Sequence, residues 1–101
     1  MTRLVVTADA EADTGQILEN LAREASWQVA EEYGRRLRET LERVVEMPES
    51  RARRPALGPE ARIAIVYPYV LIYDYTHENN TVTLLRILHG RRKITRDLLK
   101  R

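Results

Sequence analysis

The hydrophobic and polar positions of the chain follow two rhythms, which change near residue 60. In the second half, runs rich in Val, Ile, Leu, Tyr and Thr are separated by short polar breaks, as in strands on a half-buried pleated surface. These runs predict three strands, at Arg62–Tyr67, Tyr69–Thr76 and Thr81–His89. The break at His77–Asn80 predicts a hairpin between the last two strands, because asparagine tolerates the positive φ angles of tight turns.

The first half instead repeats its apolar residues every three or four positions, as helices with one buried side do. The run Arg3–Ala8 predicts a short first strand. Thr7 or Asp9 can then cap a first helix, because either side chain can accept a bond from a free backbone N–H. This helix is expected to end near Ala25.

Ser26 can cap a second helix, which begins at Trp27. It is expected to end near Met47, because Pro48 cannot continue a helix. The link between the two helices is minimal, so they are expected to form an antiparallel helical hairpin. The buried side of the second helix is predicted to comprise Trp27, Ala30, Tyr33, Leu37, Leu41, Val44 and Val45.

The two faces of the predicted strand hairpin can be assigned if its turn has an even number of residues. One face then holds Tyr69, Leu71, Tyr73, Tyr75, Val82, Leu84, Arg86 and Leu88, and the other holds Val70, Ile72, Asp74, Thr83, Leu85, Ile87 and His89. Both faces are largely apolar, unlike those of a sheet with one side in water. The helices can cover one face, and a partner is expected to cover the other. Arg86, among the tyrosines, is expected to stack on a ring or to pair with a helix glutamate.

Two segments outside these elements are basic. Pro48–Pro59 is a proline-rich loop whose Arg51, Arg53 and Arg54 can contact phosphate or carboxylate, or simply be solvated. The tail Gly90–Arg101 carries six cationic side chains against one carboxylate. Its three apolar residues are compatible with a short amphipathic helix or with a frayed terminus.

The length and composition narrow the class of protein. A chain of 101 residues is expected to form one domain, 1–101, and the order of elements makes its fold α+β. It has no cysteine, and His77 and His89 are too far apart for a local metal motif, so no disulfide, metal or cofactor is expected. No apolar run reaches the ~20 residues that cross a bilayer, so a soluble cytoplasmic protein without membrane contact is expected.

The net charge of +2 hides an uneven distribution along the chain. Residues 1–50 hold 6 basic and 11 acidic side chains and residues 51–101 hold 11 basic and 4 acidic ones, so the two halves carry −5 and +7. A positive half suits an acidic protein segment or a nucleic acid. Equally, the basic half can neutralise the acidic helices of the same molecule.

Three phrases of the sequence, in this order, resemble the ParE branch of the RelE/ParE toxin superfamily over essentially the whole chain. The first is Thr7–Asp13, which resembles the capped helix start of those toxins. The second is Arg54-Pro55-x-Leu57-Gly58, followed by Arg62 and by Pro68-Tyr69-Val70-x-x-Tyr73. The third and most specific is Leu85-Arg86-Ile87-Leu88-His89-Gly90-x-Arg92.

The resemblance implies a fold and a function. The fold is an N-terminal strand, a two-helix hairpin, three antiparallel strands in a small sheet and a short basic tail. The function is that of the toxin of a type II toxin–antitoxin module, held inactive by a ParD-like antitoxin. ParE-like toxins are associated with poisoning DNA gyrase, whereas the RelE-like branch cuts messenger RNA on the ribosome.

The residues help to choose between the two branches. RNA cleavage needs a proton donor, a proton acceptor and cations around the phosphate. In the nuclease branch an arginine usually occupies the place of Val70, and sheet lysines and a late tyrosine are common; here the lysines are only Lys93 and Lys100. The remaining candidates for catalysis are His89 and Arg92.

We therefore expect a toxin that acts by binding and is not an enzyme, with ribosome-dependent mRNA cleavage as the alternative. No sequence-specific binding of nucleic acid is expected. A degenerate domain that binds only the antitoxin is a third possibility. The residues expected to contact partners are Arg62, Tyr73, Arg86, His89, Arg91 and Arg92.

Overall fold

The computed structural model describes all 101 residues and contains six regular elements. They are β1 (Arg3–Val6), α1 (Ala8–Glu24), α2 (Trp27–Glu46), β2 (Ala61–Val66), β3 (Tyr69–Thr76) and β4 (Thr81–His89). Two short 3-10 helices lie at Pro55–Leu57 and Arg96–Leu98. The predicted elements are confirmed, with boundaries that differ by at most two residues, apart from the tail.

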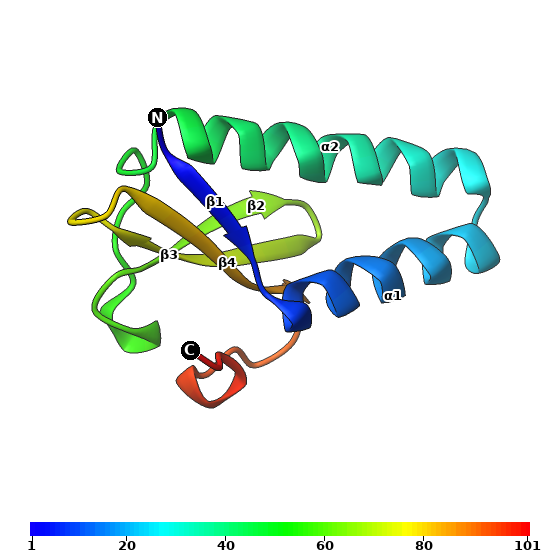
Figure 1. The fold of residues 1–101 in the computed structure, drawn as a ribbon. Coiled ribbons are helices and arrows are strands. Elements are labelled where there is room, and N and C mark those ends of the chain that lie inside the picture. The colour runs from blue at the N-terminus through cyan, green and yellow to red at the C-terminus, as the bar shows by residue number, and fades with distance from the viewer.

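The four strands form one mixed sheet in the order β1-β4-β3-β2 (Figure 1). The hairpin strands β3 and β4 and the neighbouring pair β2 and β3 are antiparallel, whereas β1 runs parallel to β4. Asn80 in the hairpin turn has the positive φ angle, 48°, that its type predicts.

Both helices begin where their caps predict. The Thr7 hydroxyl accepts a hydrogen bond from the Ala10 N–H at 3.1 Å, and the Ser26 hydroxyl accepts one from the Val29 N–H at 3.1 Å. Each cap satisfies one of the N–H groups that a helix start leaves free. The Thr7 hydroxyl also donates to the Leu85 carbonyl, which ties the start of α1 to β4.

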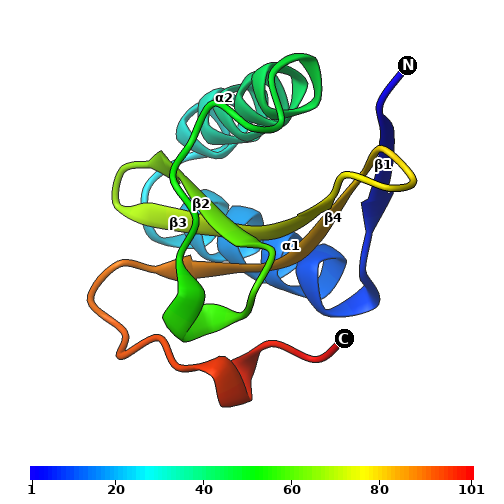
Figure 2. The same cartoon turned by 90° about the vertical axis from the view of Figure 1, so that its left-hand side faces the viewer.

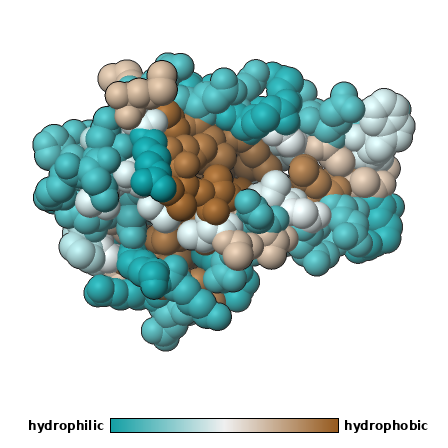
Figure 3. Space-filling view, in the orientation of Figure 1, coloured by the Kyte–Doolittle hydropathy of each residue, from teal (hydrophilic) through white to brown (hydrophobic).

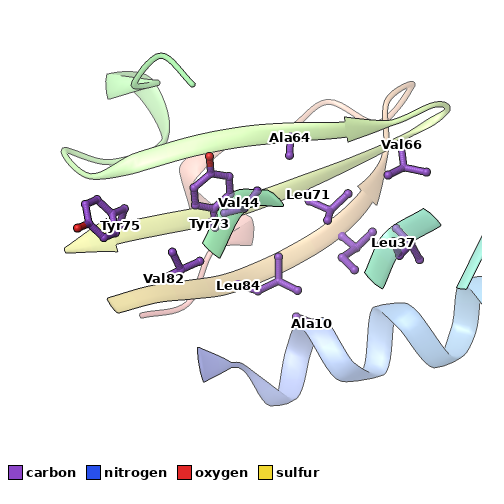
Figure 4. Packing of buried hydrophobic residues seen from close by; sticks show 11 residues of the cluster. Ala10, Leu37, Val44, Ala64, Val66, Leu71, Tyr73, Tyr75, Val82 and Leu84 are labelled. Carbon is purple, nitrogen blue, oxygen red and sulfur yellow. The ribbon is translucent and has the colours of Figure 1, made fainter. Parts of the chain in front are cut away.

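The main core lies between the helices and one face of the sheet (Figure 4). Leu37 and Val44 of α2 and Ala10 of α1 point toward side chains from β2, β3 and β4, among them Ala64, Val66, Leu71, Tyr73, Tyr75, Val82, Leu84 and Ile87. The prediction that Trp27 is buried is wrong, because its side chain is 63% exposed. The first turn of α2 lies at the tip of the helical hairpin, which extends beyond the sheet (Figure 1).

A β-bulge interrupts the strand hairpin. Near the four-residue turn the pairing follows the predicted parity, with Tyr75 opposite Val82 and Tyr73 opposite Leu84. Between Ile72 and Tyr73 the register shifts, so that Ile72 lies opposite Arg86 and Leu85 is the extra residue. The predicted faces are therefore right for β3 and wrong for the residues of β4 beyond the bulge.

The bulge moves side chains of β4 from one face to the other. Ile87 belongs to the core under the helices, and Leu88 joins Ile72 and Leu85 on the far face. His89, predicted on the far face, lies opposite Tyr69 at the end of the strand.

The C-terminal tail covers the far face of the sheet (Figure 2). Ile72, Leu85 and Leu88 are at most 3% exposed, and they pack with Leu99, which is 6% exposed; Leu57, Ile94 and Leu98 lie against this cluster. The prediction that this face needs a partner is wrong. The tail itself supplies the cover, as an extended segment with one 3-10 turn, and it forms neither an amphipathic helix nor a frayed terminus.

Candidate functional site

The basic segment after β4 is the region where the sequence places most of its candidate residues. The chain turns sharply there, because the Gly90 N–H donates to the Pro68 carbonyl at 2.8 Å and the Arg92 N–H donates to the His89 carbonyl at 3.0 Å. His89, Arg91 and Arg92 are all exposed at this turn, and neither arginine forms an ion pair. The turn therefore presents two free cations beside an imidazole.

His89 and Arg92 lie on one groove between α1 and the end of β4. Its lining comprises Asp13, Gln16, Ile17, Asn20, Leu21, Glu24, Tyr69, Ile87, Leu88, His89 and Arg92. The His89 ring meets the Tyr69 ring edge to face, with centroids 5.8 Å apart. Burial, with Tyr33 and Glu24 adding to it, raises the pKa of Tyr69, so its phenol is neutral at pH 7.

The hydrogen bond to His89 limits what this imidazole can do. Its Nδ1 accepts from the Arg91 N–H at 3.0 Å, which assigns the neutral tautomer with the proton on Nε2. In this arrangement the Nε2–H of His89 can donate to solvent, and neither ring nitrogen is free to accept a proton. A general base at this site would have to break the bond to Arg91 first.

Arg86 is held inside the molecule by Asp13 of α1. Its Nε donates to Asp13 Oδ2 at 2.7 Å and its Nη2 donates to Asp13 Oδ1 at 2.9 Å, a bidentate ion pair. The same carboxylate accepts the Ile87 N–H at 2.9 Å, and Arg86 Nη1 donates to the Leu98 carbonyl at 3.1 Å. The expected pairing with a helix carboxylate is therefore present, with an aspartate in place of a glutamate.

These hydrogen bonds also affect the pKa of Arg86 and its availability to a partner. The hydrogen bonding of Arg86 to the Asp13 carboxylate, opposed in part by burial, raises the pKa of Arg86 further above its usual range. Arg86 thus joins α1, β4 and the tail, and it is not free for a partner.

Arg62 and Tyr73 also lie inside the fold. Arg62 is 6% exposed, and its Nη1 donates to the carbonyls of Glu49 and Arg51, which fastens the proline-rich loop to β2. Tyr73 is fully buried, and burial raises its pKa, an effect that Arg51 and Arg62 offset only in part. Although Arg51 lies near, no group meets hydrogen-bond geometry at the Tyr73 hydroxyl. The structure thus gives both residues internal positions in place of the expected partner contacts.

An apolar groove between β1 and α2 was not predicted. Leu4, Leu41 and Val45 line it together with Arg38, Glu42 and Glu46. Figure 3 shows a continuous apolar patch on this side of the molecule, below α2 and beside β1. Leu41 and Val45 have the i, i+4 spacing of a helix face, but the sequence does not show that the short β1 leaves part of that face open.

The two halves of the chain neutralise each other only in small part. One arginine of the basic half, Arg86, pairs with a carboxylate of the acidic half, and His77 Nδ1 lies 3.6 Å from Glu49 Oε1. The other ion pairs join residues within one half. The acidic helices lie on one side of the sheet and the basic tail on the other (Figure 2), so the charge is separated in space.

Two kinds of feature are absent from the structure. No helix combines the length and the apolar composition that a membrane span needs. No cluster of three His, Cys, Asp or Glu side chains could hold a metal ion.

Comparisons with known proteins identify the family to which this mixed four-stranded sheet with a helical hairpin on one face belongs. Residues 4–94 match the model of a family described as the ParE toxin of type II toxin-antitoxin system, parDE. The chain therefore belongs to the ParE toxin family. A search of curated proteins found no match.

Two solved structures share the fold. One, titled chromosomal ParDE TA system from P. aeruginosa, is 20% identical with a TM-score of 0.74, and the match covers 88% of this chain and 96% of that one. The other is the isolated E. coli RelE toxin, 19% identical with a TM-score of 0.63, and the match covers 92% of this chain and 88% of that one.

Proposed function

We propose that this protein is a cytoplasmic toxin, that it poisons DNA gyrase by binding to it, and that it is neutralised by a ParD-like antitoxin. The family match over residues 4–94 supports the type of module. The gyrase target rests on the resemblance to the ParE branch and on the side chains that are free to act.

The observation that carries the proposal is the internal engagement of Arg62, Tyr73 and Arg86. A phosphate-cleaving site needs cations and proton-transfer groups directed at solvent. These three side chains instead hold the loop, the core and the tail together. The open surface retains His89 and the arginines of the basic turn, which is more suitable for binding than for cutting RNA.

The apolar groove between β1 and α2 is the surface that we assign to the antitoxin. Leu41 and Val45 offer apolar contacts, and Arg38, Glu42 and Glu46 at its rim offer polar ones. An amphipathic antitoxin segment that orders on this groove would bury the patch visible in Figure 3. Burial of apolar area would then drive the neutralisation.

Expression in bacteria with and without a ParD-like antitoxin tests the proposal. Growth arrest with gyrase-linked DNA breaks is expected without the antitoxin, together with trapped cleavage complexes when purified toxin meets purified gyrase. Leu41→Glu should weaken binding of the antitoxin, and Glu39→Gln, on the exposed side of α2, should not. Intact DNA during arrest would exclude gyrase, and antitoxin binding without arrest would indicate a degenerate domain.

A second candidate is mRNA cleavage, which the meeting of Tyr69, His89 and Arg92 on one groove favours. Tyr69 is neutral and can donate a proton, and Arg92 can contact a phosphate. Mapping transcript ends after induction decides the question. Discrete cuts within codons that disappear in His89→Ala would establish cleavage, and intact transcripts would exclude it.

A further inference from the structure

The outer strand of the sheet, β2, has an open edge. It pairs only with β3, and its Ala61 turns its main chain outward: the Ala61 N–H donates to the Gly58 carbonyl and its carbonyl accepts from the Arg54 N–H. The direction of the main-chain N–H and C=O groups alternates from one residue of a strand to the next. The main-chain groups of Ile63 and Ile65 therefore also point away from β3. The proline-rich loop covers this edge only as far as the bridge between Arg53 and Arg62.

Large apolar side chains flank the open part of the edge. Ile65 is 62% exposed and Tyr67 is 79% exposed, although the tail buries the neighbouring far-face residues. Two grooves meet at Ile65. One is lined by Ile65, Tyr67, Pro68, Val70, His89, Gly90 and Arg91, and the other by Arg51, Ala52, Arg54, Ile63, Ala64 and Ile65.

The charges around the edge indicate what can bind there. Arg51 and Arg54 line one groove and Arg91 the other, and none of the three forms an ion pair. No Asp or Glu lines either groove. A second copy of the chain, paired edge to edge, would bring the same arginines together, and like charges at a two-fold interface disfavour it. An acidic segment of another chain fits this charge.

We propose that the edge of β2 from Ile63 to Tyr67 binds an extended acidic peptide segment of a partner protein by β-strand addition. The Ile65 N–H and the carbonyls of Ile63 and Ile65 supply the main-chain hydrogen bonds. Alternate apolar side chains of the peptide pack on Ile65 and Tyr67, and its carboxylates pair with Arg54 and Arg91. This site lies apart from the apolar groove of α2 and does not depend on the target of the toxin.

Amide hydrogen exchange measured by NMR on the full-length protein tests the site directly. The probe is a capped peptide of alternating glutamate and valine, at millimolar concentration. We expect the Ile65 amide to exchange about tenfold more slowly with the peptide, whereas the inward-facing Ala64 amide, already paired with β3, stays unchanged. An Ile65 amide unaffected by the peptide would overturn the proposal.

Matched variants separate edge pairing from other contacts. Ile65→Pro removes the outward N–H without removing a bond to β3, and Ile65→Val keeps it. Ile65→Pro should weaken peptide binding at least about tenfold and Ile65→Val by less than about threefold. Arg54→Glu, in the exposed loop, should weaken it similarly to Ile65→Pro and favour a lysine–valine peptide instead.

Two results would contradict the proposal. Equal binding by Ile65→Pro and the unchanged protein would show that the edge is not used. Protection of Ile65 without peptide, together with a dimer mass by analytical ultracentrifugation, would show that the occupant is a second copy.

Discussion

Asp13 accepts three hydrogen bonds beside the bulge in β4. The parallel strand β1 pairs with β4 only as far as Leu84, so the edge of β4 beyond that point has no strand beside it. Asp13 takes that place by accepting the Ile87 N–H, and it holds Arg86 with the same carboxylate. The bulge at Leu85 is the backbone change that brings both donors to one acceptor.

Asp13→Asn is expected to lower the free energy of unfolding by about 2–3 kcal/mol, because it leaves the guanidinium of Arg86 half-buried and without its counter-charge. Urea denaturation measures the change. Glu39→Gln is the control, since it weakens an exposed ion pair with Arg35 and should cost less than about 1 kcal/mol. Equal losses for the two variants would show that the Asp13 pair adds nothing beyond a surface contact.

Tyr73→Phe is expected to change the free energy of unfolding by less than about 1 kcal/mol at pH 7, because the buried hydroxyl has no hydrogen-bond partner to lose. At alkaline pH the two proteins should diverge. Tyr73 has a raised pKa when folded, so the unfolded chain releases this proton first as the pH rises above about 10, and stability falls there. Urea denaturation at pH 7 and above pH 10 would detect a smaller alkaline loss in Tyr73→Phe, and an identical loss would refute the assignment.

At the scale of elements, the tail is the segment that completes the fold. Its last residue, Arg101, donates to both carboxylate oxygens of Asp74 in β3, at 2.7 and 2.9 Å, and to the Leu57 carbonyl at 2.9 Å. Leu99 is buried against Ile72, Leu85 and Leu88 of the sheet. The tail therefore acts as a strap that is fixed at its end as well as at its start.

Leu99→Ala is expected to destabilise the protein by about 1–3 kcal/mol, below the upper range for buried leucines because the tail can detach without unfolding the sheet. Exposure of Ile72, Leu85 and Leu88 should also increase the fluorescence of an apolar dye. Lys100→Ala, at the exposed neighbouring position, is the control and should stay within about 0.5 kcal/mol. Dye binding equal to that of the control would mean that the tail does not depend on Leu99.

The elements were predictable from sequence because their signals are local. Thr7, Ser26 and Asn80 mark a helix start, a second helix start and a turn within a few residues of themselves. The bulge was not predictable, because Asp13, which accepts from Arg86 and Ile87 beside it, lies 73 residues before Arg86 in the chain. The tail was misjudged since the spacing of its apolar residues fits a helix as well as an extended strap.

The same contrast between local signals and contacts distant in sequence explains which candidate site residues are exposed and which are buried. The basic turn at His89, Arg91 and Arg92 follows directly after a strand, and its side chains are exposed in the structure. The burial of Arg62 and Tyr73 depends on a loop and on a helix far away in sequence, so the phrases that contain them could not indicate it.

At the scale of the whole molecule, the separation of charge is the property that a partner meets first. The acidic helices and the basic tail lie on opposite sides of the sheet. Charges arranged in this way orient an approaching partner and accelerate its association, and salt screens them.

We expect the association rate with an acidic peptide segment of a partner to fall about tenfold as salt rises from about 0.05 to about 0.5 M, with a smaller change in the dissociation rate. Stopped-flow fluorescence measures both rates. The double variant Arg96→Glu, Lys100→Glu should associate more slowly at low salt and match the unchanged protein at high salt. An association rate that does not respond to salt would show that the tail has no part in the encounter.

The parallel pairing of β1 with β4 has a consequence for how the protein is made. Arg3 of β1 pairs with Thr81 of β4, 78 residues later in the chain, so this contact is of long range. Contacts of such long range form late, whereas the helical hairpin, made of neighbouring segments, can form early during synthesis. A nascent chain thus carries its helices before it has a sheet for them to cover. The sheet, and the surfaces that it shapes together with the helices, can form only after β4 has been made.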